Sequence, residues 1–252
     1  MKYQIEKTHL PAILPLRDLF LQETNFQIRY HACHERNWTD SYLISVNKEP
    51  VGYGSVIGIE NRGDRNDIFE FYLIPAYRKW KSRIFSSLLT ETGAAFIECQ
   101  SNDLTLSAML FEFAENISSG VTLFADDRTT DLHPPGMIFR QREQQDQLFE
   151  HKGEPEGDYV IELDNKIIAT GGYLTHYNKP FADLYMEVKE DFRMRGAGSF
   201  LLQEIKRACY QHGRVPAARC DMNNKASWSS LLKAGFHECG FMLTGTVKNT
   251  AY

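Results

Sequence analysis

The chain has 252 residues, of which 42% are hydrophobic and 24% charged, a composition ordinary for a globular protein with one large domain or two of about 120 residues. The formal net charge of −5 and the lack of any run of Lys and Arg argue against a nucleic-acid partner. No apolar run approaches the roughly 20 residues of a membrane span, and the first residues lack the apolar core of a signal peptide. Five scattered cysteines predict no disulfide framework. We therefore expect a cytoplasmic protein without a membrane or nucleic-acid partner.

The first hundred residues change from a helical to an extended pattern. Apolar residues at helical spacing predict helices in the first forty residues, and alternation predicts strands at 42–49 and 50–59. His31, Cys33 and His34 could suggest metal ligands, but they are too compact, and no second ligand pair follows at a usual distance. We expect surface histidines at a helix end and no metal site.

A polar segment divides the chain. Residues 126–136 end in Pro134-Pro135-Gly136, a composition that predicts a linker. We therefore expect one domain at residues 1–125 and a second at residues 137–252.

The most informative stretch of the second domain runs from Leu184 to Cys209. Residues 184–188 alternate between apolar and polar side chains, as a strand does, and apolar residues from Phe200 onward recur at helical spacing. Two glycines in the turn between them let the backbone approach a ligand closely, and the first amides of the helix carry the positive end of its dipole. A strand, a glycine turn and a helix start predict a phosphate site, with a plain tight turn as the alternative.

Two motifs in this half resemble those of a known family. The turn reads Arg193-x-x-Gly196-x-Gly198, which is similar to the Arg/Gln-x-x-Gly-x-Gly/Ala signature of the GNAT superfamily of N-acetyltransferases. Downstream, Asn224 and Phe236 keep the interval of twelve residues between the Asn and the Gly-Phe of that family's last motif. Two motifs in the right order are much more specific than either alone.

The resemblance implies an α/β (α+β) fold of two GNAT-like domains, each with a mixed, mostly antiparallel central sheet flanked by helices. It also implies acetyl-coenzyme A as the cofactor, with its pantetheine arm on the strand edge and its pyrophosphate on the glycine turn. The cofactor-binding residues expected on this basis are Val188, Arg193, Met194, Arg195, Gly196, Ala197, Gly198, Ser199, Asn224 and Ser227.

Acetyl transfer to an amine requires a group that takes a proton from the ammonium. Asp183 and Glu187 are the catalytic candidates, because they share one face of the predicted strand. They lie about 13 Å apart and cannot both contact the same nitrogen. We prefer Glu187, which is nearer to the expected position of the thioester. Either residue could instead be a surface carboxylate.

The chain departs from the family pattern in two places. The family often has a Tyr that protonates the leaving thiolate seven residues after the motif Asn, where this chain has Leu231. Tyr185, Tyr210 or Ser230 could substitute, or the thiolate could leave unassisted. GNAT folds also usually have two helices between their first two strands, where only about sixteen polar residues are available in the second domain.

The first domain contains a weaker copy of the same pattern. Arg78 aligns with Arg193 at an offset of 115 residues, and both glycines of the turn are then replaced, by Lys81 and Arg83. A turn with side chains there cannot bring its amides to a pyrophosphate in the same way. We predict a degenerate N-terminal copy, with chance resemblance between two α/β segments as the alternative.

We therefore expect an acyltransferase that moves an acetyl group from acetyl-coenzyme A to a primary amine of a small molecule, by direct attack in a ternary complex. The alternative is a non-catalytic regulatory or sensor module that binds an acyl-coenzyme A, which the missing Tyr favours. A structural pseudoenzyme is disfavoured because Gly196 and Gly198 are present. Either a monomer or a homodimer is compatible with the sequence.

Overall fold

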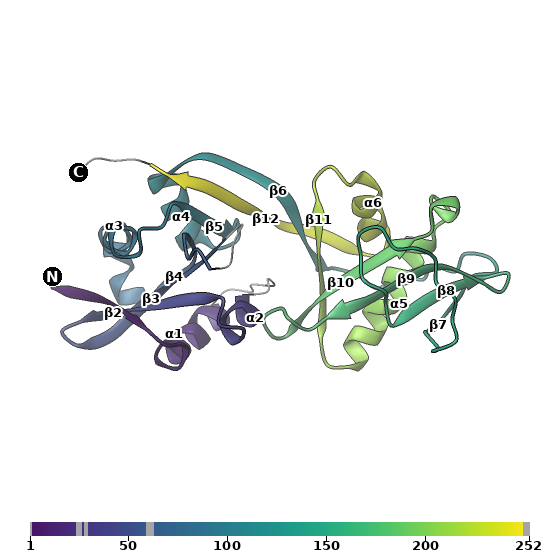
Figure 1. Ribbon diagram of the computed structural model, residues 1–252, viewed down its shortest axis with the longest axis horizontal. Coiled ribbons are helices and arrows are strands. Elements are labelled where there is room, and N and C mark those ends of the chain that lie inside the picture. Colours follow the sequence, from purple (N-terminus) through teal and green to yellow (C-terminus); the bar gives the residue numbers. More distant parts are fainter. Residues whose placement is uncertain (1, 24–26, 28–29, 59–62, 249–252) are drawn as a thin grey trace. The chain divides into compact units, whose positions relative to one another are not determined.

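The computed structural model describes residues 2–23, 27, 30–58 and 63–248, which divide into two compact units (Figure 1). Of these residues, the N-terminal unit contains 2–23, 30–58, 63–120 and 240–248. The C-terminal unit contains Gln27 and residues 121–239.

The N-terminal unit is a mixed sheet with helices on both faces. Its strands follow the order β1-β2-β3-β4-β5-β12, and all the pairs described are antiparallel except β4 with β5. Its elements are β1 Tyr3–Thr8, α1 Leu10–Glu23, α2 Tyr30–Glu35, β2 Thr39–Val46, β3 Glu49–Ile57, β4 Asp67–Leu73, the 3₁₀ helix η1 Pro75–Trp80, α3 Lys81–Thr92, β5 Phe96–Gln100, α4 Leu104–Phe113 and the first part of β6 Ala114–Asp126.

The C-terminal unit repeats this plan with fewer helices. Its strands follow the order β6-β11-β10-β9-β8-β7, β10 and β11 are parallel, and α5 packs across β8 to β11. Residues 142–158, all of them described, contain no helix or strand. Its elements are β7 Ile138–Gln141, β8 Tyr159–Leu163, β9 Lys166–Leu174, β10 Phe181–Val188, the 3₁₀ helix η2 Glu190–Phe192, α5 Ala197–Gln211, β11 Val215–Asp221, α6 Lys225–Lys233 and β12 Phe236–Val247.

The fold class predicted from the sequence is confirmed, and so is the internal copy. In the N-terminal unit the last parallel pair of β4 and β5 is Ile68 with Ile97, and in the C-terminal unit the last pair of β10 and β11 is Asp183 with Ala217. Ile68 and Asp183 are 115 residues apart, the offset found in the sequence. The copies differ after the strand, because η1 runs directly into α3 and Lys81 has helical angles (φ −52°). The N-terminal copy therefore has the strands but not the glycine turn.

Two strands carry the chain from one unit into the other, so the compact units differ from the expected ranges 1–125 and 137–252. Residues 121–125 of β6 pair with β11 in the C-terminal unit, whereas residues 242–246 of β12 pair with β5 in the N-terminal unit. Each sheet thus contains a strand from the other half of the sequence.

The segment expected to be a linker, residues 126–136, lies within the C-terminal unit. The amides of Asp127 and Arg128 both donate to the carbonyl oxygen of Gly235 at 3.1 Å, and the amide of Leu132 donates to Oε1 of Gln203 at 2.7 Å. These backbone amides thus find partners in the C-terminal unit without a strand of their own.

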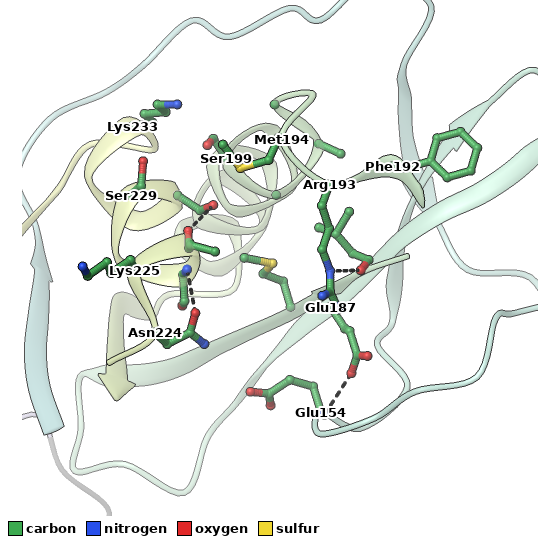
Figure 2. Close-up of a pocket in the computed structure, with 18 of the residues that line it drawn as sticks. Glu154, Glu187, Phe192, Arg193, Met194, Ser199, Asn224, Lys225, Ser229 and Lys233 are labelled. Atoms are coloured by element: carbon green, nitrogen blue, oxygen red, sulfur yellow. Dashed lines mark hydrogen bonds between the residues drawn. The ribbon is translucent and has the colours of Figure 1, made fainter. Parts of the chain in front are cut away.

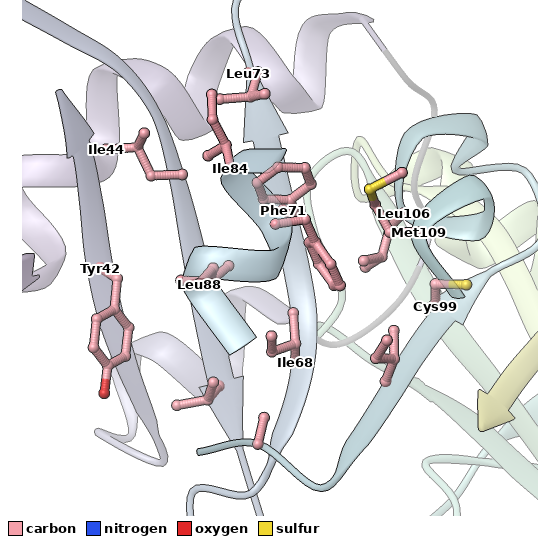
Figure 3. Packing of buried hydrophobic residues seen from close by; sticks show 14 of the residues in the cluster. Tyr42, Ile44, Ile68, Phe71, Leu73, Ile84, Leu88, Cys99, Leu106 and Met109 are labelled. Carbon is pink, nitrogen blue, oxygen red and sulfur yellow. The ribbon is translucent and has the colours of Figure 1, made fainter. Parts of the chain in front are cut away.

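The core of the N-terminal unit lies between β4 and α3. Figure 3 shows Ile68 and Phe71 of β4 beside Ile84 and Leu88 of α3. The rings of Phe71 and Phe85 meet edge to face with centroids 4.9 Å apart. β4 is buried on both faces, so its opposite face must also be covered.

That opposite face of β4 carries a buried ionic network around Glu70. Its carboxylate accepts hydrogen bonds from Nη2 of Arg17 at 3.0 Å and the hydroxyl of Tyr53 at 2.9 Å, and lies 3.0 Å from Nε2 of His34. Burial alone would raise the pKa of Glu70, but Arg17 and His34 outweigh it and lower the pKa to about 2. His34 also contacts the hydroxyl of Thr39 at 3.0 Å. The expectation that His34 lies on the surface is therefore wrong, because its ring is buried against Glu70.

Substitution of Arg17 by Met should lower the free energy of unfolding of the N-terminal unit by about 3–5 kcal/mol, because it leaves the Glu70 charge buried without its main partner. The matched control is Lys7→Met, since Lys7 forms an exposed pair with Asp40 and its loss should cost about 1 kcal/mol or less. Urea unfolding of both variants measures the difference. Equal losses would contradict the role given to the network.

The same network predicts that the free energy of unfolding depends on pH in the acidic range. The pKa of Glu70 is depressed from 4.5 to about 2 in the folded state, so its contribution is complete above pH 4.5 and is lost as the pH falls toward 2. Urea unfolding across this range should show the loss in the wild type and a smaller loss in Arg17→Met. Parallel pH profiles in the two proteins would contradict this explanation.

Candidate functional site

A pocket opens where β10 and β11 separate. β10 pairs with β11 only through Asp183, whereas it pairs with β9 as far as Val188. Among the described strands, none pairs with the β11-facing side of β10 beyond that point. Met186, Glu187 and Val188 line the resulting opening, whose volume is about 760 Å³. The β11-facing edge of β10 therefore has no strand partner at Met186 to Val188 among the described strands, and the carbonyl of Val188 accepts a hydrogen bond from Nε of Arg193 at 3.2 Å.

The glycine turn forms a second wall of the pocket. Met194 and Gly196 adopt positive φ angles of 61° and 86°, and Gly196 is the N-cap of α5. No side chain of the described residues caps this helix, so its first amides remain free to donate to a ligand. A Cβ on Gly198 would lie 3.1 Å from Cε of Met186. Gly196 thus suits its left-handed backbone angle, and a Cβ at Gly198 would press on the end of the Met186 side chain where α5 packs on β10.

A third wall comes from the start of α6. The side chain of Asn224 accepts a hydrogen bond from the amide of Ser227 at 3.0 Å and so caps the helix. Lys225 and Lys233 of α6 also line the pocket. In Figure 2 these two lysines lie on one side of the pocket, and Glu154 and Glu187 lie on the other.

The structure brings most of the residues expected from the sequence to this one pocket. Asp183 and Arg195 are not among the described residues that line it. Those that do are Glu187, Val188, Arg193, Met194, Gly196, Ala197, Gly198, Ser199, Asn224 and Ser227.

Glu187 is held by the backbone of a neighbouring segment. Its carboxylate accepts hydrogen bonds from the amides of Lys152 at 2.9 Å, Gly153 at 3.2 Å and Glu154 at 3.2 Å. Burial by itself would raise the pKa of Glu187, but the three hydrogen bonds outweigh it and hold the pKa below its ordinary value.

Asp183 is engaged elsewhere. One of its oxygens lies 2.9 Å from Nη2 of Arg219 on β11, and the same oxygen lies 3.3 Å from Nε2 of His176. The carboxylate is almost fully buried. Asp183 therefore joins β10 to β11 at the point where the two strands separate.

The position at which the resemblance implied a Tyr is part of the core. Leu231 is buried among the residues that pack under α5 and α6. Of the three substitutes considered, Ser230 lines the pocket, and its hydroxyl donates to the carbonyl of Ala226 at 2.9 Å. Tyr185 and Tyr210 are not among the described lining residues, and the hydroxyl of Tyr210 donates to Asp126 at 2.7 Å.

Sequence reasoning did not single out the segment Lys152-Gly153-Glu154, which lines the pocket opposite α6. The segment has no regular spacing of apolar residues and no motif, so nothing in the local sequence predicted that it belongs to the site. Lys225 and Lys233 were also not singled out, although both lie within the motif that begins at Asn224.

Comparison with known proteins assigns this half of the chain to a class. Residues 123–241 match the model of the acetyltransferase (GNAT) family, and no curated protein sequence matches the chain. We conclude that this region is a domain of the GNAT acetyltransferase family.

Solved structures extend the likeness to the whole fold. A GNAT-family acetyltransferase from Colwellia psychrerythraea is 16% identical with a TM-score of 0.76, and the alignment covers 97% of this chain and 100% of that one. A tandem GNAT protein from the clavulanic acid biosynthesis pathway is 11% identical with a TM-score of 0.60, over 99% and 100% of the two chains. A GCN5-related N-acetyltransferase from Sphaerobacter thermophilus is 12% identical with a TM-score of 0.58, over 98% and 96%. The chain thus has the tandem GNAT fold.

The described residues contain no cluster of three or more His, Cys, Asp or Glu side chains arranged to hold a metal ion. In the same part of the chain, no helix is long and apolar enough to cross a membrane.

Substitution of Asn224 by Ala should lower the free energy of unfolding of the C-terminal unit by about 1 kcal/mol, because α6 loses its N-cap. Asn223→Ala is the matched control, since the described cap is made by Asn224 alone, and a surface change of this kind should stay within about 0.5 kcal/mol. Urea unfolding measures both. Equal stability of the two variants would contradict the capping role.

Proposed function

We propose that the C-terminal unit is an acetyl-coenzyme A-dependent N-acetyltransferase that acts on a primary amine of a small molecule by direct attack in a ternary complex. The observation that carries the proposal is the continuity of the pocket. One cavity contains both the uncapped start of α5 and the open edge of β10. An elongated ligand with a phosphate at one point and an amide chain at another matches these two features.

The residues present fit that cofactor. The amides of Ala197, Gly198 and Ser199 would donate to the pyrophosphate, because helix N-termini favour phosphate groups. Lys225 and Lys233 add positive charge to the same cavity. The open edge of β10 at Val188 would bind the pantetheine arm, whose amide would share or replace the hydrogen bond that the carbonyl of Val188 accepts from Arg193. When bound, the cofactor would supply an acetyl thioester at the separation of β10 and β11.

The chain must then supply proton transfer and orientation. The carboxylates on the side opposite the lysines provide negative charge near the opening, where a cationic amine would enter. Ser230 places a hydroxyl in the pocket, and this hydroxyl would donate to the leaving sulfur by giving up its hydrogen bond to the carbonyl of Ala226. This role is proposed because Leu231, at the usual Tyr position, is buried in the core.

One cofactor site per chain is part of the proposal. In the N-terminal unit, η1 leads straight into α3 with Lys81 and Arg83 in place of the two glycines. A cytoplasmic location and a monomeric or homodimeric state complete the proposal.

The second candidate function is a non-catalytic acyl-coenzyme A sensor. The observation that favours it is Leu231, since a domain that only binds the cofactor needs no proton donor for the leaving thiolate. Both candidates require the same pocket, so cofactor binding does not separate them.

Release of free coenzyme A separates the two candidates. The wild-type protein would be mixed with acetyl-coenzyme A and, in turn, spermidine, lysine, tyramine or no added amine, and the thiol measured with time. An enzyme should release coenzyme A faster with at least one amine than without, and mass spectrometry should find the acetylated amine. Tight binding of acetyl-coenzyme A with no release under any condition would contradict the enzyme and support the sensor.

A further inference from the structure

Both carboxylate oxygens of Glu187, the residue expected to act as the base, accept hydrogen bonds. Oε1 of Glu187 accepts from the amide of Lys152, and Oε2 accepts from the amides of Gly153 and Glu154. A carboxylate that accepts three backbone hydrogen bonds is stabilised in its charged form and has a low proton affinity. Its lowered pKa agrees with this geometry. Glu187 is therefore a poor acceptor for a proton from an ammonium.

The three hydrogen bonds instead give Glu187 a structural task. They come from consecutive residues, 152–154, in a stretch that has no helix or strand of its own. An ion pair between Nζ of Lys152 and Glu190, at 2.8 Å, also connects this segment to the residues that follow β10. From β10, the carboxylate of Glu187 accepts hydrogen bonds from three consecutive backbone amides of this exposed segment. It thereby holds the segment against the pocket.

The residue that this arrangement brings to the pocket is Glu154. Its amide is bound to Glu187, while its side chain lines the cavity, and Figure 2 shows that side chain extending away from Glu187. Within the part of the chain that the structure describes, no group forms a hydrogen bond or ion pair with the carboxylate of Glu154. Glu154 is an exposed residue overall; its partial burial and the charges of Asp183 and Glu187 raise its pKa, and Arg219 on β11 opposes the shift.

Asp183 does not compete for this role. Its carboxylate is paired with Arg219 and lies beside His176, and it is not among the described residues that line the cavity. Three carboxylates lie near the point where β10 and β11 separate. Among them, Glu154 is the one that lines the cavity and has no hydrogen-bond or ion-pair partner among the described residues.

We propose that Glu154 is the catalytic residue that takes the proton from the acceptor ammonium, and that Glu187 is a positioning residue that holds residues 152–154 in place. In this step the N–H bond of the ammonium breaks, the proton goes to a carboxylate oxygen of Glu154, and the electron pair stays on nitrogen. Glu154 later releases the proton to solvent. The assignment rests on the proposed function and adds that the acceptor is an amine that enters as a cation.

Four variants test the assignment, each assayed with the amine that gives the fastest coenzyme A release in the wild type. Glu154→Gln keeps the backbone bond to Glu187 but removes the proton acceptor. Glu154→Asp keeps a carboxylate. Glu187→Gln keeps the size of the side chain but disturbs the three hydrogen bonds that it accepts from backbone amides. The matched control is Glu156→Gln, two residues along the same segment, where the side chain pairs with Arg142 at 2.8 Å.

We expect Glu154→Gln to lower kcat about 100-fold or more while calorimetry finds the wild-type affinity for acetyl-coenzyme A. Glu154→Asp should recover part of the lost rate, and Glu156→Gln should behave as the wild type. In the wild type, kcat/KM should fall as the pH decreases through the raised pKa of Glu154, because the protonated carboxyl accepts no proton. That acidic limb should disappear in Glu154→Gln. In Glu187→Gln it should remain, with a lower rate and a higher KM for the amine.

Full activity of Glu154→Gln with an unchanged acidic limb would overturn the assignment. So would a Glu187→Gln variant that loses the limb while Glu154→Gln retains it, since Glu187 would then be the base. A wild type that binds acetyl-coenzyme A but releases none with any amine would contradict the proposed function itself, and the assignment would fall with it. The two failures are thus distinguishable.

Discussion

The separation of β10 from β11 beyond Asp183 is the constraint on which the site depends. Three parallel pairs hold the strands together, and the ion pair between Asp183 and Arg219 lies where they part. A sheet that continued to pair would leave no free backbone edge and no space for a ligand. Because the strands diverge, the same β10 that forms the core on its α5 side can offer Glu187 and Val188 to the pocket.

The two copies of the fold show that this separation is not sufficient for a cofactor site. β4 and β5 also pair only through Ile68, yet the following turn is a 3₁₀ helix that continues into α3. In that unit the equivalent strand carries Glu70, whose charge is enclosed by Arg17 and His34. At the offset of 115 residues Glu70 corresponds to Tyr185, which is not among the described residues that line the pocket, so the network does not take the place of the pocket itself. The glycine turn, more than the strands, distinguishes the unit with the candidate site.

The parts of the site with a local cause could be predicted from the sequence. Gly196 suits a left-handed backbone angle in its own turn, Gly198 lies close to Met186 of the preceding strand, and Asn224 caps the helix that it begins. The alternating pattern of residues 184–188 also correctly predicted a strand. The fold class followed because the same motifs occur in a known order. These features depend on short-range geometry, which a sequence displays directly.

The parts that depend on distant segments could not be predicted. Glu187 was predicted to be a site residue, but the three backbone amides that bind it come from residues 152–154, a stretch without a regular apolar pattern that would predict its position. Glu154 was missed for the same reason. The sequence also did not predict that β6 and β12 each run from one unit into the other, because an extended pattern does not show which strand will pair with it.

The most direct test of the account is a calorimetric titration with acetyl-coenzyme A of the wild type, Met194→Glu and Met222→Glu. Met194 is exposed on the glycine turn and lines the pocket, whereas Met222 is an exposed methionine that is not among the described lining residues. A carboxylate at Met194 should repel the pyrophosphate without disturbing the core. The account predicts one molecule bound per wild-type chain, much weaker binding by Met194→Glu, and wild-type binding by Met222→Glu. No binding by the wild type, or equal affinity in all three proteins, would contradict the claim that the turn before α5 holds the cofactor.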